Sequence, residues 1–545
     1  MAPVNHLKTI VAGPELSDTF VKESWEQLKN VVLRILTNGT VGVSTENLYQ
    51  LCETLCQYEK ASYVYQKIHD QLSAYVQNQL QLLSTESLTD TAFCETVYSL
   101  WIKYTNQIVQ IRCIFLYLDR TYFAHNTKYG SIWDMAIDIF KSNILKYDII
   151  WQKVLNGILT MIRLQRSNNT VDEGVLQRNI RMLLDLNLYH SAFERFLLDE
   201  TRQFYDKEGS HLIQTMNIFD YLDHVASRLH QESTIRIRSY LDKSTKSSIQ
   251  SIVGNELLIR RVTTILEKSF QYFLQLESIE DIDYARLSLL YRLLQKVDKI
   301  DICSRYFTMY VKQKGSRILR SNNEDVVQKI LKLSQFESQV DEVVDHSFEG
   351  DELFVEGLKE GIEYFSNLKE NNVIKILAKY IDQVLRNSKR TLDQTLLDKG
   401  MFLFQNIRAK DEFEMIYKRD LAKRLLLNES SQQAEKFMLA KMKDECGAGY
   451  TGKMEGMVKD IEKSVDLMRE FNMENKGSVP TLNVNLLTYG FWPSYTPTTI
   501  NLPPVFKNLQ NVYNEFYTGK YKRRILTWQN TLSICEVLCH YPLVS

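Results

Sequence analysis

The stretch from Lys410 to Asp460 reads KDEFEMIYKRDLAKRLLLNESSQQAEKFMLAKMKDECGAGYTGKMEGMVKD and is the most informative part of the chain. It contains no proline, and its first apolar residues recur at the spacing of one helix face: Phe413, Ile416, Tyr417, Leu421 and Leu425. The residues 434–445 continue with a charged pattern of helical period. This stretch therefore predicts consecutive helices.

The distribution of proline extends this prediction to most of the chain. No proline occurs between Glu15 and Val479, and six prolines fall between Pro480 and Pro542. Because proline inside a helix costs about 3 kcal/mol, its exclusion favours a long series of helices. We therefore expect a mainly α fold up to Val479 and a different architecture after it.

After Pro480 the pattern changes to that of a small α/β unit. Leu482, Val484 and Leu486 alternate with polar residues, the period of a half-buried strand. A second candidate strand spans Ile525–Val537, and the run Phe506–Tyr517 predicts a helix between the two. The chain ends before this unit looks complete.

Two apolar stripes near the N-terminus predict helices that could stack into a bundle or solenoid. One comprises Leu48, Leu51, Cys52 and Leu55, and the other comprises Ile111, Ile114, Phe115, Leu118 and Tyr122. Apolar residues at helical spacing are usually core, so a binding role for either stripe needs further support.

Composition excludes several classes of function. Lysine and arginine number 66 against 67 aspartates and glutamates, which argues against nonspecific nucleic-acid binding. The N-terminal residues lack the pattern of a secretory signal, and no apolar run is long enough to span a bilayer. We expect a soluble intracellular chain.

Motifs for catalysis, metals or cofactors are weak. Cys52 and Cys56, like Cys535 and Cys539, lack a second ligand pair at zinc-site spacing. Gly447, Gly449 and Gly452 spell GxGxxG but follow a helical pattern rather than a strand, so they are expected to end that helix. The sequence thus predicts no catalytic residues, no metal site and no cofactor.

The basic residues Lys418, Arg419, Lys423 and Arg424 lie on the first helix of the opening stretch. They are either a solvated face balanced by acidic neighbours or a positive patch that attracts an acidic partner. The sequence pattern alone leaves both interpretations open.

The opening stretch resembles the most recognisable block of the cullins, the scaffolds of RING-type ubiquitin ligases. The matching positions are Lys410, Asp411, Phe413, Glu414, Tyr417, Leu421 to Leu426, Glu445 to Gly447, Glu455 to Met457, Leu487, Thr488, Gly490, Trp492 and Pro493. Further matches lie earlier, at Phe193, Glu194, Phe196, Leu197, Glu200, Thr201, Tyr205, Glu208, Tyr221, Arg228, Leu229, Glu232, Arg236, Tyr240 and Leu241. The resemblance favours a positive patch at the basic residues.

The resemblance implies an elongated stalk of helical cullin repeats followed by a helical bundle and the start of a small α/β unit. We expect an N-terminal tail at 1–18, a stalk of about three repeats at 19–345, a bundle at 346–475 and an incomplete α/β unit at 476–545. Near the N-terminus, the residues 48–50, 111–112, 114–116, 118–122 and 131–134 are similar to those of the cullin-4 subfamily.

Cullins hold a substrate-receptor module at one end and a RING-box protein at the other. The resemblance therefore implies a non-catalytic scaffold that promotes ubiquitin transfer by positioning the substrate near the ubiquitin-conjugating enzyme. For the cullin-4 subfamily the module is a β-propeller damaged-DNA-binding adaptor that carries substrate receptors. The adaptor-binding residues implied are Leu48, Leu51, Leu55, Ile114, Phe115, Leu118 and Tyr122. The RING-box-binding residues implied are Leu482, Val484, Leu486, Trp492 and Trp528.

The resemblance also implies a ubiquitin-conjugating enzyme as an indirect partner, no direct contact with nucleic acid or membrane, and a location in nucleus and cytoplasm. The pattern departs from the family where Tyr521 and Arg523 replace a histidine and a glycine. The lysine that is modified by neddylation in the family has no counterpart here, so we expect no conventional activation by neddylation. The RING-box protein inserts a strand into a sheet of which only part is expected here, so RING-box binding is in question. The alternative function is therefore a truncated helical-repeat interaction protein that binds the adaptor without supporting ubiquitin transfer.

Overall fold

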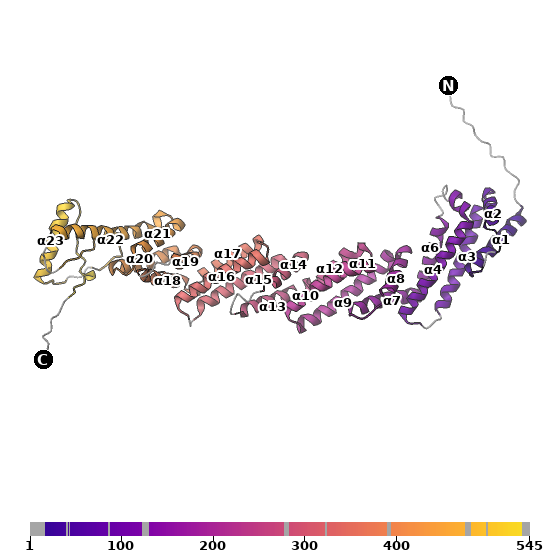
Figure 1. The fold of residues 1–545 in the computed structure, drawn as a ribbon, viewed down its shortest axis with the longest axis horizontal. Helices are drawn as coiled ribbons and strands as arrows, with labels where there is room; N and C mark the ends of the chain where they lie inside the picture. Colours follow the sequence, from indigo (N-terminus) through magenta and orange to yellow (C-terminus); the bar gives the residue numbers. More distant parts are fainter. Residues whose placement is uncertain are drawn as a thin grey trace, which may run out of the picture. The chain divides into compact units, whose positions relative to one another are not determined.

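The computed structural model describes residues 17–39, 42, 44–84, 88–122, 130–276, 283–321, 324–389, 394–474, 481–496 and 500–536. The chain divides into two units, Met1–Ile265 and Leu266–Ser545. Every regular element in the described residues is a helix, which confirms the mainly α prediction (Figure 1). The expected division at 345 and 475 stays a prediction.

Unit 1 contains α-helices, three π-helical segments (η1, η2, η3) and two 3-10 turns (η4, η5). Their bounds are α1 Asp18–Leu36, α2 Thr45–Gln57, α3 Ala61–Ser84, α4 Asp90–Ile114, η1 Leu118–Tyr122, α6 Ile132–Lys146, α7 Asp148–Arg166, α8 Glu173–Asp185, η2 Tyr189–Phe193, α9 Glu194–Thr215, α10 Ile218–His230, η3 Gln231–Arg236, α11 Ile237–Ser239, η4 Lys243–Thr245, α12 Lys246–Leu257 and η5 Ile259–Arg261.

The core of unit 1 is built around α4, which packs against α1, α2, α6, α7 and α8. Its buried aromatic residues Trp101 and Tyr104 meet Phe140 of α6, with ring centroids 4.9 Å and 5.4 Å from that of Phe140. Aromatic clusters of this kind add to the free energy gained by burial. A second group forms where α9 packs against α12 and η2.

The second apolar stripe, from Ile111 to Tyr122, does not lie on one continuous α-helix. The α-helix α4 ends at Ile114, Phe115 is its C-cap residue, and a π-helical turn follows at η1. Wider turns of this kind are often found at functional sites.

Unit 2 begins within α13 (Val262–Gln275), which runs across the boundary. The other bounds are α14 Tyr284–Lys296, α15 Ile300–Arg320, α16 Val326–Ser347, α17 Glu352–Asn367, η7 Lys369–Asn371, α18 Val373–Asn387, α19 Gln394–Asn406, α20 Lys410–Leu426, α21 Gln432–Cys446, α22 Ala448–Glu474, α23 Pro504–Lys520 and η8 Asn530–Leu532.

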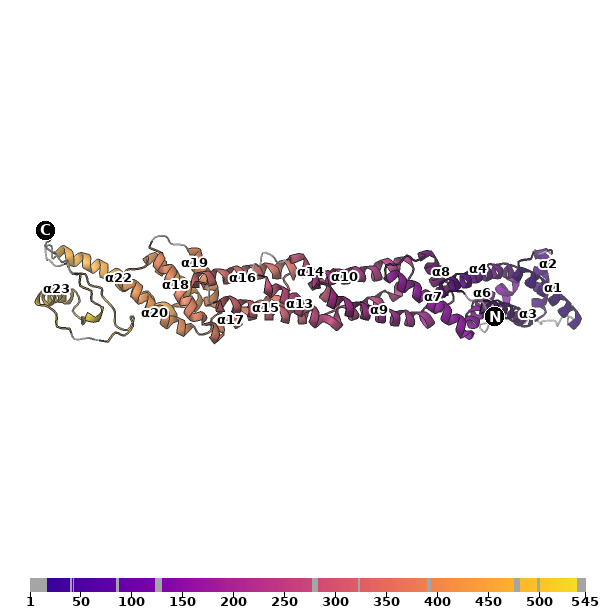
Figure 2. The same cartoon turned by 90° about the horizontal axis from the view of Figure 1, so that it is seen from below.

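In unit 2, α15 and α17 pack against each other and lie side by side in both views (Figure 2). Their approach depends on glycine. A Cβ on Gly361 would lie 2.5 Å from Val311 Cγ1, and one on Gly315 would lie 2.3 Å from Phe365 Cδ1. Downstream, α20 packs against α18 and α22, and α21 packs against α22.

The two predicted strands are not present as strands in the part of the chain that the structure describes. Residues 481–487 and 522–529 have no regular secondary structure, whereas the predicted intervening helix is found as α23. The alternation is nevertheless correct, because Val484 is buried and Thr481, Asn483 and Asn485 are exposed. Val537, the last residue of the second predicted strand, lies outside the described residues.

Candidate protein-interaction sites

The predicted adaptor-binding stripes meet where α2 packs against α4 and η1. Most of their side chains are core. Five of the seven are at most 2% exposed: Leu48, Leu55, Ile114, Phe115 and Leu118. A partner cannot reach these side chains from the surface, so their role in this conformation is to hold α2 against α4 and η1. Leu51 is half-buried, and the side chain of Tyr122 lies outside the described residues.

The accessible apolar side chains of this region are Leu51 of the first stripe and three residues that flank the stripes. Tyr49, Leu51, Leu116 and Tyr117 are all half-buried. The rings of Tyr49 and Tyr117 meet edge to face, with centroids 6.3 Å apart and an interplanar angle of 81°. We call these four residues the tyrosine surface. Half-buried aromatic residues are typical anchors of protein–protein interfaces.

Asp119 fixes the position of η1. Its Oδ2 atom pairs with Arg112 Nε at 2.6 Å, and its Oδ1 atom accepts a hydrogen bond from the Ile132 backbone N–H at 2.9 Å. The carboxylate is 4% exposed, whereas the Arg112 side chain is 48% exposed. Asp119 thus connects the end of α4 to the start of α6 and anchors η1, which follows Tyr117.

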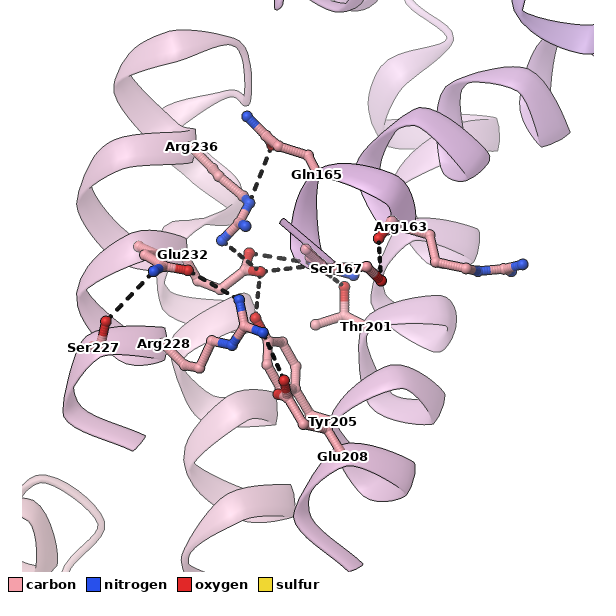
Figure 3. Close-up of polar contacts among 12 residues, drawn as sticks. Arg163, Gln165, Ser167, Thr201, Tyr205, Glu208, Ser227, Arg228, Glu232 and Arg236 are labelled. Carbon is pink, nitrogen blue, oxygen red and sulfur yellow. Dashed lines mark hydrogen bonds and ion pairs between the residues drawn. The ribbon is translucent and has the colours of Figure 1, made fainter. Parts of the chain in front are cut away.

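A buried polar network lies deeper in unit 1 (Figure 3). Arg166 donates from Nε to Glu232 Oε1 at 2.8 Å and from Nη2 to Thr201 Oγ1 at 2.8 Å. Tyr205 donates its hydroxyl to Glu232 Oε1 at 2.6 Å, and Arg236 Nη1 lies 3.1 Å from the same oxygen. The network joins α7, α9 and η3.

The electrostatics of this network keep Glu232 ionised. Burial raises the pKa of the Glu232 carboxyl, but the charges of Arg166 and Arg236 and the hydrogen bonds outweigh this, so its pKa lies below the ordinary value. The pKa of Tyr205 is raised, chiefly by burial and by the Glu232 charge. Three helical elements are therefore joined by one desolvated carboxylate.

A second buried network changes the interpretation of the basic cluster in unit 2. Arg424 is 0% exposed; its Nε atom donates to Glu435 Oε1 at 2.7 Å and its Nη1 atom to Asp382 Oδ1 at 2.8 Å. Tyr417 donates its hydroxyl to Glu435 at 3.2 Å. The prediction that Arg424 belongs to a surface patch is wrong, because its charge is balanced inside the core.

The other three basic residues of this cluster remain accessible. Arg419 and Lys423 are exposed and Lys418 is half-buried. The pKa of Lys418 is lowered, first by partial desolvation and then by the nearby charge of Lys453 on α22. Mutual repulsion of this kind marks a surface where an anionic partner would be favoured.

The predicted RING-box residues gather at the end of unit 2. Leu482, Val484, Leu486 and Trp528 pack in one cluster with Phe471 of α22 and with Tyr513 and Tyr517 of α23. Trp492 is buried separately, and its Nε1 atom donates to Asp460 Oδ2 at 3.0 Å.

Side chains of α22 bind the backbone of this C-terminal segment. Ser464 Oγ accepts from the Leu486 N–H at 2.7 Å, and Asp460 Oδ2 accepts from the Thr488 N–H at 2.8 Å. This contact explains why the segment forms no strand: its backbone groups at these positions bond to a helix rather than to a neighbouring strand.

Metal and membrane sites have no support in the described part of the chain. It contains no group of three or more histidine, cysteine, aspartate or glutamate side chains placed to hold a metal ion. No helix within it is long and apolar enough to cross a membrane. Cys52 is buried and Cys56 half-buried, whereas Cys539 lies outside the described residues.

Comparison with known proteins gives the family. Residues 25–468 match the cullin alpha solenoid domain, and residues 486–544 match the cullin alpha+beta domain. The chain belongs to the cullin family. It is 37% identical to Cullin-4A of Mus musculus over 539 residues, which cover 96% of this chain and 70% of the relative.

Two further relatives indicate which cullin subfamily this chain resembles more. Cullin-4 of Dictyostelium discoideum is 35% identical over 98% of this chain and 67% of its own length. Cullin-3 of the same organism is 28% identical over 98% of this chain and 70% of its own length. The resemblance to cullin-4 is thus confirmed, and this cullin is a scaffold of the cullin-RING ligase type.

The family motifs of the sequence prove to be largely internal in this cullin. Thr201, Tyr205, Glu232 and Arg236 meet in the unit 1 network, and Arg424 lies in that of unit 2. Of the tyrosine surface, the sequence predicted Leu51 but missed Tyr49, Leu116 and Tyr117, because each of these three sits one position beside a stripe residue. A search for aromatic residues flanking a core stripe would have found Tyr49 and Tyr117.

Proposed function

We propose that this cullin links a β-propeller damaged-DNA-binding adaptor at its N-terminal end to a RING-box protein at its C-terminal end. In this role it delivers receptor-bound substrates to a ubiquitin-conjugating enzyme for ubiquitin-dependent degradation, in nucleus and cytoplasm. The observation that carries the proposal is the similarity to two cullin-4 proteins at 35–37% identity over nearly the whole chain.

The adaptor is proposed to dock on the tyrosine surface rather than on the buried stripes. Tyr49 and Tyr117 offer a rigid aromatic pair at the junction of α2 and η1. Asp119 anchors η1, which follows Tyr117, to the ends of α4 and α6, so the backbone beside Tyr117 is held before any partner binds and less entropy is lost on association. The buried residues Phe115 and Leu118 would then act indirectly, by supporting this surface.

The RING-box protein is proposed to bind beside the C-terminal cluster. Irregular segments there expose large apolar side chains: Ile525 is 95% exposed and Ile534 is 77% exposed. A partner that adds a strand would cover such side chains and pair with backbone groups of these segments. Lys418, Arg419 and Lys423 would favour acidic partners near this end.

The adaptor proposal predicts that Tyr49→Ala combined with Tyr117→Ala weakens adaptor binding by roughly tenfold or more, because hot-spot aromatic residues carry most interface energy. The measurement is the affinity of the purified chain for the adaptor by isothermal titration calorimetry. Ile149→Ala on α7, where Ile149 is 68% exposed, is the matched control and should bind normally.

Two results would contradict the proposed adaptor site in different ways. Normal binding by the double variant would place the adaptor elsewhere on the chain. Failure of the unmodified chain to bind the adaptor would remove the adaptor proposal altogether. The change Phe115→Ala with Leu118→Ala should also reduce binding, but together with a lower unfolding temperature, because both residues are core.

A further inference from the structure

Unit 2 contains a groove that takes no part in the proposed contacts with the adaptor or the RING-box protein. It lies along α15 and the end of α17 and has a volume of about 790 Å³. Three cationic side chains line it, Lys312, Arg317 and Arg320, and none of the described residues that line it is acidic. The groove therefore combines a concave shape with a lining in which the described charged residues are all cations.

The carboxylates nearest to these cations are weakly held. Glu360 pairs with Lys312 at 2.7 Å and Glu370 pairs with Arg320 at 2.7 Å, but the two glutamates are 66% and 72% exposed. Ion pairs as exposed as these contribute little to stability. A ligand with several carboxylates can replace them at small cost.

One cation is held in place before any ligand binds. Arg320 Nε donates to Asn371 Oδ1 at 2.8 Å, and the buried Asn371 amide in turn donates to the Phe365 carbonyl at 2.8 Å. This chain of hydrogen bonds fixes the guanidinium at one end of the groove. A fixed guanidinium is suited to pair with a carboxylate through two hydrogen bonds.

The groove also has accessible apolar surface between the charges. Met309 is 51% exposed and Tyr364 is 48% exposed, and Leu368 is half-buried beside them. Lys312 Nζ lies 5.0 Å from the centroid of the Tyr364 ring, so cation and aromatic surface are adjacent. A simple phosphate or sulfate would leave this apolar surface unused.

We propose that this groove docks an acidic peptide segment of a partner protein that carries one large apolar side chain among its carboxylates. The apolar side chain packs between Met309 and Tyr364, and the carboxylates pair with Lys312, Arg317 and Arg320. Lys312 and Arg320 are about 12 Å apart along α15 at the rise of a helix, a span that about four residues of extended peptide cover.

The test uses the full chain and a fluorescein-labelled peptide of about 12 residues, a length set by that span with flanking residues, with aspartate and glutamate around a central phenylalanine. Fluorescence anisotropy should show saturable binding that weakens as salt is raised. Lys312→Gln with Arg317→Gln should weaken binding roughly tenfold or more, and Met309→Ser by severalfold.

Matched controls come from the same unit. Arg305→Gln lies on α15 with its side chain 78% exposed, and Met415→Ser removes a methionine that is 71% exposed on α20. Both control variants should bind the peptide as the unmodified chain does. Unchanged thermal unfolding of all variants would show that the groove variants remain folded.

Three results would overturn the proposal. These are no saturable binding at low salt, equal weakening by Arg305→Gln, and equal affinity for a peptide whose phenylalanine is replaced by glutamate. Full competition by inorganic tripolyphosphate, with no effect of Met309→Ser, would assign the groove to small anions instead. The peptide test does not involve the adaptor or the RING-box protein, so the groove proposal can fail while the proposed function holds, and the reverse.

Discussion

At the scale of single residues, the described part of each unit contains a fully buried arginine–glutamate pair. Arg166 and Glu232 are both 0% exposed in unit 1, as are Arg424 and Glu435 in unit 2. Desolvation makes such pairs expensive to form, but removing one partner is worse because it leaves an unpaired buried charge. Each pair joins two helical elements, α7 and η3 in unit 1 and α20 and α21 in unit 2.

Glu232→Gln should therefore destabilise unit 1 by about 3–5 kcal/mol, the usual cost of breaking a buried pair. The substitution leaves Arg166 and Arg236 without their shared countercharge. Chemical denaturation followed by circular dichroism measures the loss. Asp199→Asn is the matched control on α9, where Asp199 pairs with Arg202 and both side chains are about half exposed; it should change stability by less than about 1 kcal/mol.

The same residue gives a pH dependence of defined sign. The folded-state pKa of Glu232 is lowered from its ordinary value of 4.5. Its ionised form therefore contributes stability that is fully present above pH 4.5 and is lost as pH falls through the lower, folded-state pKa. Glu232→Gln should be less sensitive to pH in that window, and an acid unfolding curve of unchanged steepness would contradict this assignment.

The helix α20 shows which residue positions can be predicted from the sequence and which cannot. The apolar stripe of α20 was predicted correctly, since Phe413, Tyr417 and Leu421 are buried. Arg424 was misplaced because a charged residue next to the exposed Lys423 looks like surface. Its burial depends on Glu435 and Asp382, which lie on other helices and which local spacing cannot connect to it.

At the scale of elements, α22 takes the place that a neighbouring strand would occupy. Asp460 accepts hydrogen bonds from the Thr488 N–H and hydroxyl, each at 2.8 Å, and from Trp492 Nε1 at 3.0 Å. Alternation in the sequence correctly predicted which side of 482–486 faces inward. It could not predict the partner, because a helix and a strand can cover the same apolar side.

Asp460→Ala should release the segment 486–492 and destabilise unit 2 by roughly 3 kcal/mol, since three hydrogen bonds to one buried carboxylate are lost. Hydrogen exchange at the Thr488 amide and the fluorescence of Trp492 report the release. The control Asp466→Ala lies on α22 with a side chain 70% exposed. Protection of Thr488 that survives Asp460→Ala would mean that α22 does not hold this segment.

At the scale of the whole molecule, the sequence predicted the helical class and the family, because both depend on patterns repeated over hundreds of residues. It did not predict the tyrosine surface or the groove along α15, because each requires side chains from two elements to be placed together. The stripe residues Leu48 and Phe115 illustrate this difference. Their spacing correctly predicted helices, but both side chains are buried, so they support the surface from inside and do not form part of it.

The central claim is that one chain holds adaptor and RING-box protein at the same time. The most direct measurement is size-exclusion chromatography with light scattering of this chain mixed with both proteins. We predict a single species that contains one copy of each. Separate binary complexes, or recovery of the adaptor alone with this chain, would contradict the claim and favour an interaction protein that does not support ubiquitin transfer.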